Sequence, residues 1–237
     1  MASACKMFGV KAVIGLPEDA NPNKVAAMRA LGAELIFHGA DFDAARLHCE
    51  QLAKEEGYRF VHPVNDRLLV AGVGTQALET IEDLPDVQVL MIPLGGGSGV
   101  SGACIVAKGI DPAIEVLAVQ SEQAPAGYLS WKQGEIVEAE MKTFAEGVAT
   151  ASGYELAQAI IKELLDDFLL VSDDEIRRAI GTLVDKAHTL AEGAGATALA
   201  GAIKYPEKVK GKKVAITVSG ANITVEQLRK SLEVYQG

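Results

Sequence analysis

An α/β fold is predicted from two features of the sequence. Short apolar runs alternate with longer runs in which apolar residues recur at helical spacing, an order typical of parallel strands joined by crossover helices. The composition agrees, because the 237 residues are 49% hydrophobic and 23% charged, as in ordinary globular proteins. This length allows one large domain or two small ones, each with a sizeable core.

The first elements of the chain can be predicted from their end signals. Residues 13–16 form an apolar run that stops at a proline, and they are predicted as a strand. Asn21 and Pro22 then open a helix, because asparagine is a good N-cap and proline suits the first helical position. The next elements predicted are a strand over 34–37, a helix over 43–56 that closes at a glycine, and a strand over 59–61.

The rest of the chain continues the same alternation. Helices are predicted over 68–81, 99–108, 153–165, 172–191, 193–203 and 224–234, and strands over 88–92, 115–119 and 213–218. Residues 130–144 are more polar and irregular. Ser172-Asp-Asp-Glu175 has the pattern of a capping box, in which the serine hydroxyl and the glutamate carboxylate each accept a backbone N–H of the helix start.

Charge and cysteine content bound the class of protein. The formal net charge of −10 repels phosphate backbones, so a nucleic-acid partner is not expected. The three cysteines lack metal or redox spacing and are predicted to be free thiols in reducing surroundings. No apolar run has the length of a membrane span, and the first residues lack the character of a signal or transit peptide. We therefore expect a cytoplasmic protein without membrane contact.

No metal site is predicted. The four histidines lack the spacing of a zinc site. Glu163, Asp166 and Asp167 form an acidic cluster without a neighbouring histidine or cysteine, and this cluster is interpreted as a solvated helix end.

A glycine-rich segment over residues 93–102 is the strongest chemical signal. It lies between a predicted strand and a predicted helix, where backbone N–H groups and the helix N-terminus together bind phosphate. A P-loop would need Gly-Lys-Ser/Thr, which is missing. Gly97-Ser-Gly-Val-Ser-Gly102 formally matches a dinucleotide-binding turn, with Glu115 or Gln120 in the region of its ribose-binding residue, so an NAD site stays open. A structural turn without ligand also stays open.

A second signal lies near the end of the chain. The apolar run before Ser219 is predicted as a strand, and open α/β sheets bind their ligands at the carboxyl ends of parallel strands. Ser219 is therefore a candidate ligand contact, although a serine before a helix is also a common cap.

Five segments in order resemble one family, the threonine/serine dehydratases (ammonia-lyases), which include serine racemase. The segments are Gly95-Gly-Gly-Ser-Gly99, Ala118-Val-Gln-Ser-Glu-Gln-Ala-Pro-Ala126, Thr143-Phe-Ala-Glu-Gly-Val-Ala149, Leu190-Ala-Glu-Gly-Ala-Gly-Ala196 and Val218-Ser-Gly-Ala-Asn222. The resemblance implies a pyridoxal 5'-phosphate (PLP) enzyme with the tryptophan synthase β-like fold, which has two three-layer αβα domains. It further implies that the N-terminal portion of that fold is lacking, with an incomplete small domain over 1–63 and a larger PLP-binding domain over 64–237.

The resemblance also assigns roles to residues. The cofactor phosphate would bind to the backbone of five residues, Gly95, Gly96, Gly97, Ser98 and Gly99. Ser219 would hydrogen-bond the pyridine nitrogen, and Glu192 would lie near the ring. Gln120 and Ala126 stand where metal-dependent serine racemases have two carboxylates, so no metal ligand is expected there.

The implied activity is the deamination of L-threonine or L-serine to a 2-oxo acid and ammonia. In the family, a Ser-Phe-Lys-x-Arg-Gly-Ala segment supplies the lysine that forms the Schiff base, and this string does not occur in the sequence. The catalytic residue is therefore unassigned, and the activity of this chain is expected to be impaired. The alternative is a PLP- or phosphate-binding remnant without catalysis, or one part of a split enzyme. Apolar surface left open by the lacking portion predicts a homo-oligomer.

Overall fold

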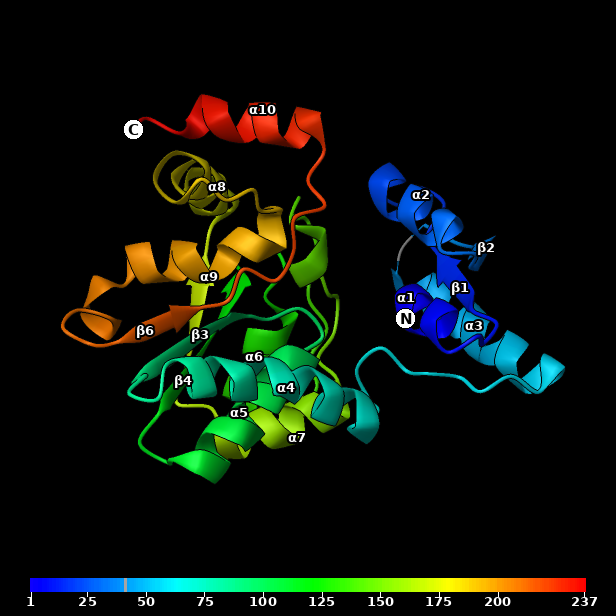
Figure 1. The fold of residues 1–237 in the computed structure, drawn as a ribbon, viewed down its shortest axis with the longest axis horizontal. Coiled ribbons are helices and arrows are strands. Elements are labelled where there is room, and N and C mark those ends of the chain that lie inside the picture. The colour runs from blue at the N-terminus through cyan, green and yellow to red at the C-terminus, as the bar shows by residue number, and fades with distance from the viewer. Residues whose placement is uncertain (41) are drawn as a thin grey trace. The chain divides into compact units, whose positions relative to one another are not determined.

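The computed structural model describes residues 1–40 and 42–237, which divide into two compact units, Met1–Val61 and His62–Gly237 (Figure 1). Each unit has its own sheet. The division between Val61 and His62 lies two residues before the boundary expected from the resemblance.

The first unit is built on two parallel strands. Its elements are α1 (Ala2–Met7), β1 (Val13–Leu16), α2 (Pro22–Ala30), β2 (Glu34–Phe37) and α3 (Phe42–Glu56). The predicted start of α2 is confirmed, because the side chain of Asn21 accepts the N–H groups of Asn23 and Lys24. The strand predicted over 59–61 is wrong. No described strand pairs with these residues, and without a neighbouring strand a segment gains no ladder hydrogen bonds.

The second unit is a three-layer αβα arrangement. Its helices are α4 (Arg67–Asp83), α5 (Ser98–Ile110), α6 (Ala126–Gln133), α7 (Glu155–Leu164), α8 (Asp173–Ala187), α9 (Gly193–Lys204) and α10 (Val225–Val234), with two 3-10 turns, η1 (Glu146–Val148) and η2 (Pro206–Lys208). Its strands are β3 (Val89–Pro93), β4 (Glu115–Ser121), β5 (Asp167–Val171) and β6 (Val214–Ile216). All strand pairs are parallel, in the order β5-β4-β3-β6.

The central strands are apolar on both faces because helices cover both sides. One face of the sheet packs against α8 and α9, with Met91, Leu117 and Val119 in its core. The other face packs against α4, α5 and α7. Its core contains Leu90 and further strand side chains that alternate with those of the first face. A parallel sheet covered in this way produces the continuous apolar runs that marked β3 and β4 in the sequence.

Two elements of this unit differ from the sequence-based expectation. Strand β5 is not among the predicted elements, and the last four residues of helix α6, 130–133, fall in the region 130–144 that is expected to be irregular. The interpretation of the acidic cluster as a solvated helix end is wrong for Asp166 and Asp167, whereas Glu163 is exposed in the last turn of α7. The carboxylate of Asp166 accepts the N–H of Val116 (2.7 Å) and pairs with Lys108 (2.7 Å), while Asp167 pairs with Lys208 (2.5 Å). These contacts attach the start of β5 to its neighbours.

Side-chain caps define the starts of the two outer helices. The predicted capping box of Ser172 and Glu175 at α8 is confirmed, and Thr224 forms a second one with Gln227 at α10. Such caps satisfy backbone N–H groups that the helix itself leaves without a partner.

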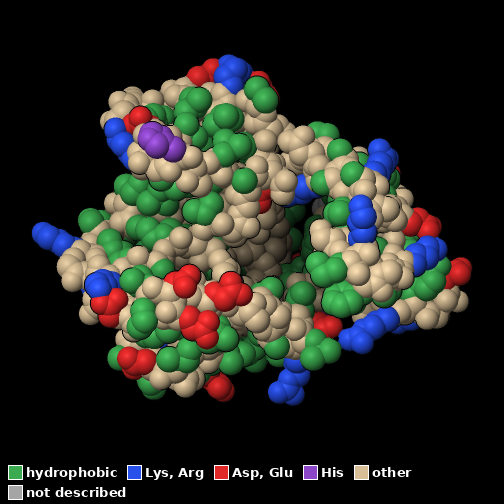
Figure 2. Space-filling view, viewed as in Figure 1, with side chains coloured by type: hydrophobic (Ala, Val, Ile, Leu, Met, Phe, Trp, Pro, Cys, Tyr) green, Lys and Arg blue, Asp and Glu red, His purple; other side chains and the backbone are tan. Residues whose placement is uncertain are grey.

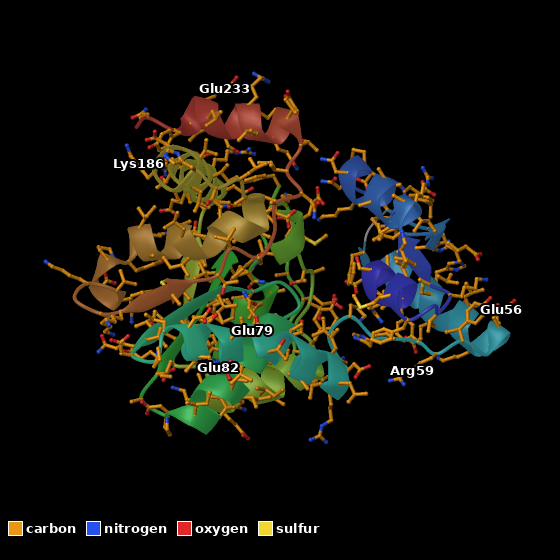
Figure 3. All side chains as sticks on the ribbon, viewed as in Figure 1. Glu56, Arg59, Glu79, Glu82, Lys186 and Glu233 are labelled. Carbon is orange, nitrogen blue, oxygen red and sulfur yellow. The ribbon has the colours of Figure 1, made fainter. Side chains whose placement is uncertain are left out.

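The negative charge of the chain is visible on the outer face of α4. Figure 2 shows acidic side chains gathered there, and Figure 3 shows Glu79 and Glu82 extending from this helix away from the sheet. Among the described residues, no helix has both the length and the apolar character needed to cross a membrane.

Candidate functional site

The glycine loop and the Ser219 turn lie at the same edge of the sheet. The loop follows β3 and the turn follows β6, and these strands are parallel neighbours. The N–H of Thr217 donates to the carbonyl of Met91 (3.0 Å), so the two strands stay paired up to the point where each segment leaves the sheet. The topology therefore brings together the two signals that the sequence places more than a hundred residues apart.

Close packing explains why the loop is made of glycine. A Cβ on Gly95 would overlap the carbonyl oxygen of Gly147, and one on Gly96 would overlap the side chain of Val64. Gly97 has a φ of +98°, a left-handed conformation that strains any residue with a side chain, and its Cβ would lie 2.8 Å from that of Ala157. Three successive positions thus exclude side chains for separate steric reasons.

The loop presents a row of free backbone donors. Gly97 is the N-cap of α5 and no side chain caps this helix. Within the described part of the chain, the N–H groups of residues 95–100 donate no hydrogen bond, whereas that of Ser101 donates to the carbonyl of Gly97 (2.9 Å). Unpaired N–H groups at a helix N-terminus favour an anion through both hydrogen bonding and the helix dipole. The loop therefore fits a phosphate group.

The last two residues of the loop are less constrained. Ser98 is the first residue of α5 and has no positive φ, so its side chain is accommodated without strain. A Cβ on Gly99 would meet no atom within 4 Å. Gly99 also lines an open groove of about 140 Å³ together with Thr217 and Val218, so the loop and the end of β6 border one space.

Glu192 holds the turn that carries Ser219. Its N–H donates to the carbonyl of Gly220 (3.0 Å), and its carboxylate accepts the N–H of Asn222 (3.1 Å). A Cβ on Gly220 would lie 2.7 Å from a carboxylate oxygen of Glu192. Ser219 itself is exposed at this edge of the sheet. The structure thus places Glu192 beside the turn that carries Ser219.

Gln120 is part of the buried scaffold beneath the site. Its side chain is fully buried and its Oε1 accepts the N–H of Tyr128 (3.0 Å). A Cβ on Gly127 would lie 3.1 Å from the same oxygen, so helix α6 packs directly on this amide. Among the described residues, no group of three or more histidine, cysteine or acidic side chains has the geometry of a metal site.

Two residues that support the loop were not singled out in the sequence. Thr150 donates its hydroxyl to the carbonyl of Gly95 (3.4 Å), and Asp173 binds the turn that leads to Gly147. The sequence does not reveal these contacts, because they join segments that are distant in the chain. Asp173 itself lies within the capping-box string Ser172-Asp-Asp-Glu175, which predicts only a helix start.

Comparisons with known proteins agree with this geometry. The family described as pyridoxal-phosphate dependent enzymes matches residues 1–220. The chain is 39% identical over 229 residues to the L-threonine ammonia-lyase of Thermotoga maritima, covering 96% of this chain and 57% of that protein. It is 34% identical over 228 residues to the catabolic L-threonine dehydratase TdcB of Escherichia coli K12, covering 95% of this chain and 69% of that protein.

Solved structures give the same result. The processed form of threonine deaminase isoform 2 from Solanum lycopersicum superposes with a TM-score of 0.92 at 33% identity, covering 98% of this chain and 69% of that one. Maize serine racemase superposes with a TM-score of 0.89 at 28% identity, covering 98% and 72%. The chain spans 57% and 58% of the lengths of two L-threonine ammonia-lyases that it matches, from Thermotoga maritima and Geobacter sulfurreducens. With a family match over residues 1–220 and this fold, the chain belongs to the pyridoxal-phosphate dependent enzymes.

Proposed function

We propose that the chain carries the PLP-binding part of an L-threonine or L-serine ammonia-lyase, an enzyme that deaminates its substrate to a 2-oxo acid and ammonia. The observation that carries this proposal is the row of unpaired N–H groups over residues 95–100, set at the same sheet edge as Ser219. The identities with L-threonine ammonia-lyases and dehydratases support the substrate class.

The residues of this chain would divide the work of binding the cofactor. The N–H groups of Gly95, Gly96, Gly97, Ser98 and Gly99 would donate to the phosphate. The hydroxyl of Ser219 would donate a hydrogen bond to the ring nitrogen, and a neutral hydroxyl, unlike a carboxylate, does not stabilise a proton on that nitrogen. PLP supplies an electron sink for a carbanion at the substrate Cα. By leaving this nitrogen unprotonated, Ser219 would favour loss of a β-hydroxyl from the substrate over transamination.

Two lysines of the unit His62–Gly237 are paired with carboxylates outside the glycine loop. Lys108 lies at the other end of α5 with Asp166, and Lys204 pairs with Glu122 and Glu175. General base catalysis, which the lysine supplies in the family, typically accelerates a reaction by a factor of ~10²–10⁴. Because the sequence contains no Ser-Phe-Lys-x-Arg-Gly-Ala segment, we propose that this chain turns over slowly unless a further segment or a second chain supplies the lysine. The same observation favours the second candidate, a PLP- or phosphate-binding protein that is a remnant or one part of a split enzyme.

One set of measurements separates the two candidates. The purified chain is titrated with PLP in the presence and absence of inorganic phosphate, reduced with borohydride, and mapped by mass spectrometry for a lysine that carries the cofactor. A labelled lysine with formation of 2-oxobutyrate from L-threonine supports the ammonia-lyase. Binding that phosphate competes away, without label or product, supports the binding protein. No PLP binding at millimolar cofactor contradicts both.

Two further proposals concern the setting of the chain. We propose a cytoplasmic location, supported by three free cysteines, of which Cys104 is buried with its thiol pKa raised by burial to about 12.

We also propose a homo-oligomer. Exposed apolar side chains such as Ile203 and Val218 lie on α9 and just after β6, and Figure 2 shows hydrophobic side chains on this face.

A further inference from the structure

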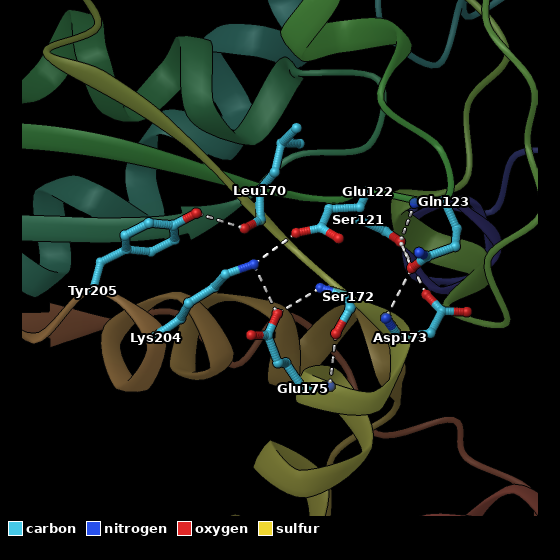
Figure 4. Close-up of polar contacts among 9 residues, drawn as sticks. All are labelled: Ser121, Glu122, Gln123, Leu170, Ser172, Asp173, Glu175, Lys204 and Tyr205. Atoms are coloured by element: carbon cyan, nitrogen blue, oxygen red, sulfur yellow. Dashed lines mark hydrogen bonds and ion pairs between the residues drawn. The ribbon is translucent and has the colours of Figure 1, made fainter.

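Asp173, the first residue of α8, is a hydrogen-bonding centre whose described contacts include neither the glycine loop nor Ser219. One carboxylate oxygen accepts the hydroxyls of Ser121 (2.9 Å) and Thr143 (2.6 Å), and the other accepts the N–H of Phe144 (3.1 Å). The N–H of Asp173 donates to the side chain of Gln123 (2.8 Å). Figure 4 shows Ser121 and Gln123 turned toward Asp173 from the end of β4.

These contacts are not those of a helix cap. Ser172 caps α8, and the three groups that donate to the carboxylate of Asp173 lie 29 to 52 residues away in the sequence. The carboxylate therefore joins three segments, namely the end of β4, the start of α8 and the turn at Thr143 and Phe144. A buried or half-buried carboxylate with several donors fixes the geometry of the groups around it.

The turn held by Asp173 leads directly to the glycine loop. The hydroxyl of Thr143 also accepts the N–H of Ala145 (3.1 Å), which orients the chain entering η1. Within η1, the carbonyl of Gly147 packs against Gly95, and beyond it Thr150 donates to the carbonyl of Gly95. The segment from 143 to 150 is thus fixed by Asp173 at one end and packed on the loop at the other.

We propose that Asp173 is a positioning residue for the phosphate-binding loop, and that it acts through the segment 143–150 on Gly95. This inference rests on the proposed function only for the identity of the ligand. Without the carboxylate, the Thr143 hydroxyl and the Phe144 N–H lose their common acceptor. The support of Gly95 by Gly147 and Thr150 then loosens, and the N–H groups of the loop no longer converge.

A matched pair of variants tests the proposal. Asp173→Asn and Asp174→Asn each remove one negative charge from the first turn of α8, so any effect of the helix dipole is shared. Asp174 is exposed, which makes it the control. Each variant of the full chain is titrated with PLP and with pyridoxal, which lacks the phosphate. Asp173→Asn is expected to weaken PLP binding about tenfold, the size typical of coupled neighbours, while pyridoxal binding changes less than about twofold.

A second readout needs no ligand. Hydrogen exchange followed by mass spectrometry is measured on the peptide that contains residues 94–100. Faster exchange of this peptide in Asp173→Asn, but not in Asp174→Asn, is the expected result. If the wild-type chain binds no PLP, the proposed function fails, and the exchange experiment still decides whether Asp173 positions the loop.

Three results would overturn the proposal: unchanged exchange and PLP affinity in Asp173→Asn, an equal loss of PLP and pyridoxal binding, or the same effect in Asp174→Asn. Should Asp173→Asn fail to fold, Thr143→Val replaces it. This variant keeps the carboxylate and removes only the hydroxyl that links it to the turn, and it should weaken PLP binding several-fold without changing pyridoxal binding. Equal affinities for PLP in Thr143→Val and wild type would also overturn the proposal.

Discussion

Gly95 has two reasons to be a glycine, and only one of them concerns a ligand. Its bare backbone leaves an N–H free for an anion, as the sequence pattern predicts. Its Cα also faces the carbonyl of Gly147, where a Cβ has no room. The second reason is steric and holds whether or not a cofactor binds, so substitution at this residue affects stability as well as binding.

Gly95→Ala should therefore destabilise the chain by about 1–3 kcal/mol, since the backbone of Gly147 would have to move. For a protein of this size, each kcal/mol lowers Tm by roughly 2–4 °C. Gly99→Ala is the control, because its Cβ meets nothing within 4 Å and alanine is favoured in a helical position. Thermal unfolding followed by circular dichroism would measure both, and a Gly95→Ala variant as stable as wild type would refute the steric explanation.

The functional role of a single residue can be predicted from the sequence only where the residue belongs to a local pattern. The glycine loop stands out because its residues are consecutive, and Ser219 because it ends an apolar run. The supporting role of Asp173 could not be predicted, since its three donors come from distant segments and its own neighbourhood reads only as a helix start. Long-range hydrogen bonds leave no spacing in the sequence that marks them.

Among the elements, α9 is attached to the ends of β4 and α8 through Lys204. Its ammonium pairs with Glu122 (2.6 Å) and Glu175 (3.0 Å), as Figure 4 shows. Burial raises the pKa of the Glu175 carboxyl, but the N–H of Ser172 and the charge of Lys204 outweigh burial and hold this pKa below its usual value of 4.5. A lowered carboxyl pKa contributes stability above the usual value, and this contribution is lost as the pH falls through the lowered one.

Lys204→Gln should consequently lower the free energy of unfolding at pH 7 by about 0.5–1 kcal/mol, as for partly exposed ion pairs. The difference from wild type should shrink as the pH falls through the lowered pKa of Glu175, because the protonated carboxyl no longer pairs with the ammonium of Lys204. Urea unfolding at several pH values measures it. Lys230→Gln, which breaks an exposed pair with Glu226 on α10, serves as the comparison and should show no measurable loss. A pH-independent difference for Lys204→Gln would speak against the ion pairs as its cause.

Elements with regular patterns and clear end signals were predictable, and those that depend on a partner were not. Helices such as α2 and α8 begin at side-chain caps that the sequence displays. Strand β5 begins with acidic residues that resemble a helix end, because their lysine and backbone partners come from other elements. The tripeptide 59–61 has strand-forming residues but no described partner strand. Strand formation depends on tertiary context more than helix formation does.

In the molecule as a whole, packing is concentrated in one unit. All three hydrophobic core clusters formed by the described residues lie within His62–Gly237. Among the described residues of Met1–Val61, the buried apolar side chains are four alanines and Val25. A unit of this size with so small a core has only marginal stability when it is isolated. We propose that the units are separate domains of unequal stability.

A fragment of residues 62–237 should accordingly fold alone with a single cooperative urea transition, whereas residues 1–61 alone should not. Light scattering on the full chain and on the larger fragment tests the proposed homo-oligomer in the same experiment. Both should run as dimers or larger species, because the exposed apolar side chains of α9 and the segment after β6 belong to the larger unit. A stable monomer for both would contradict self-association through this face, and a non-cooperative larger fragment would contradict its independence.

The parallel sheet also gives the molecule two edges with different tolerance to engineering. The glycine loop and the Ser219 turn follow the carboxyl ends of β3 and β6. The connection from η2 into β6 lies at the opposite edge of the sheet. Gly211 in this connection is exposed, has a φ of +77° and has no neighbour within 4 Å of a built Cβ. A short cysteine-bearing insertion there could carry a fluorophore that reports cofactor occupancy by energy transfer, without touching the groups that bind it.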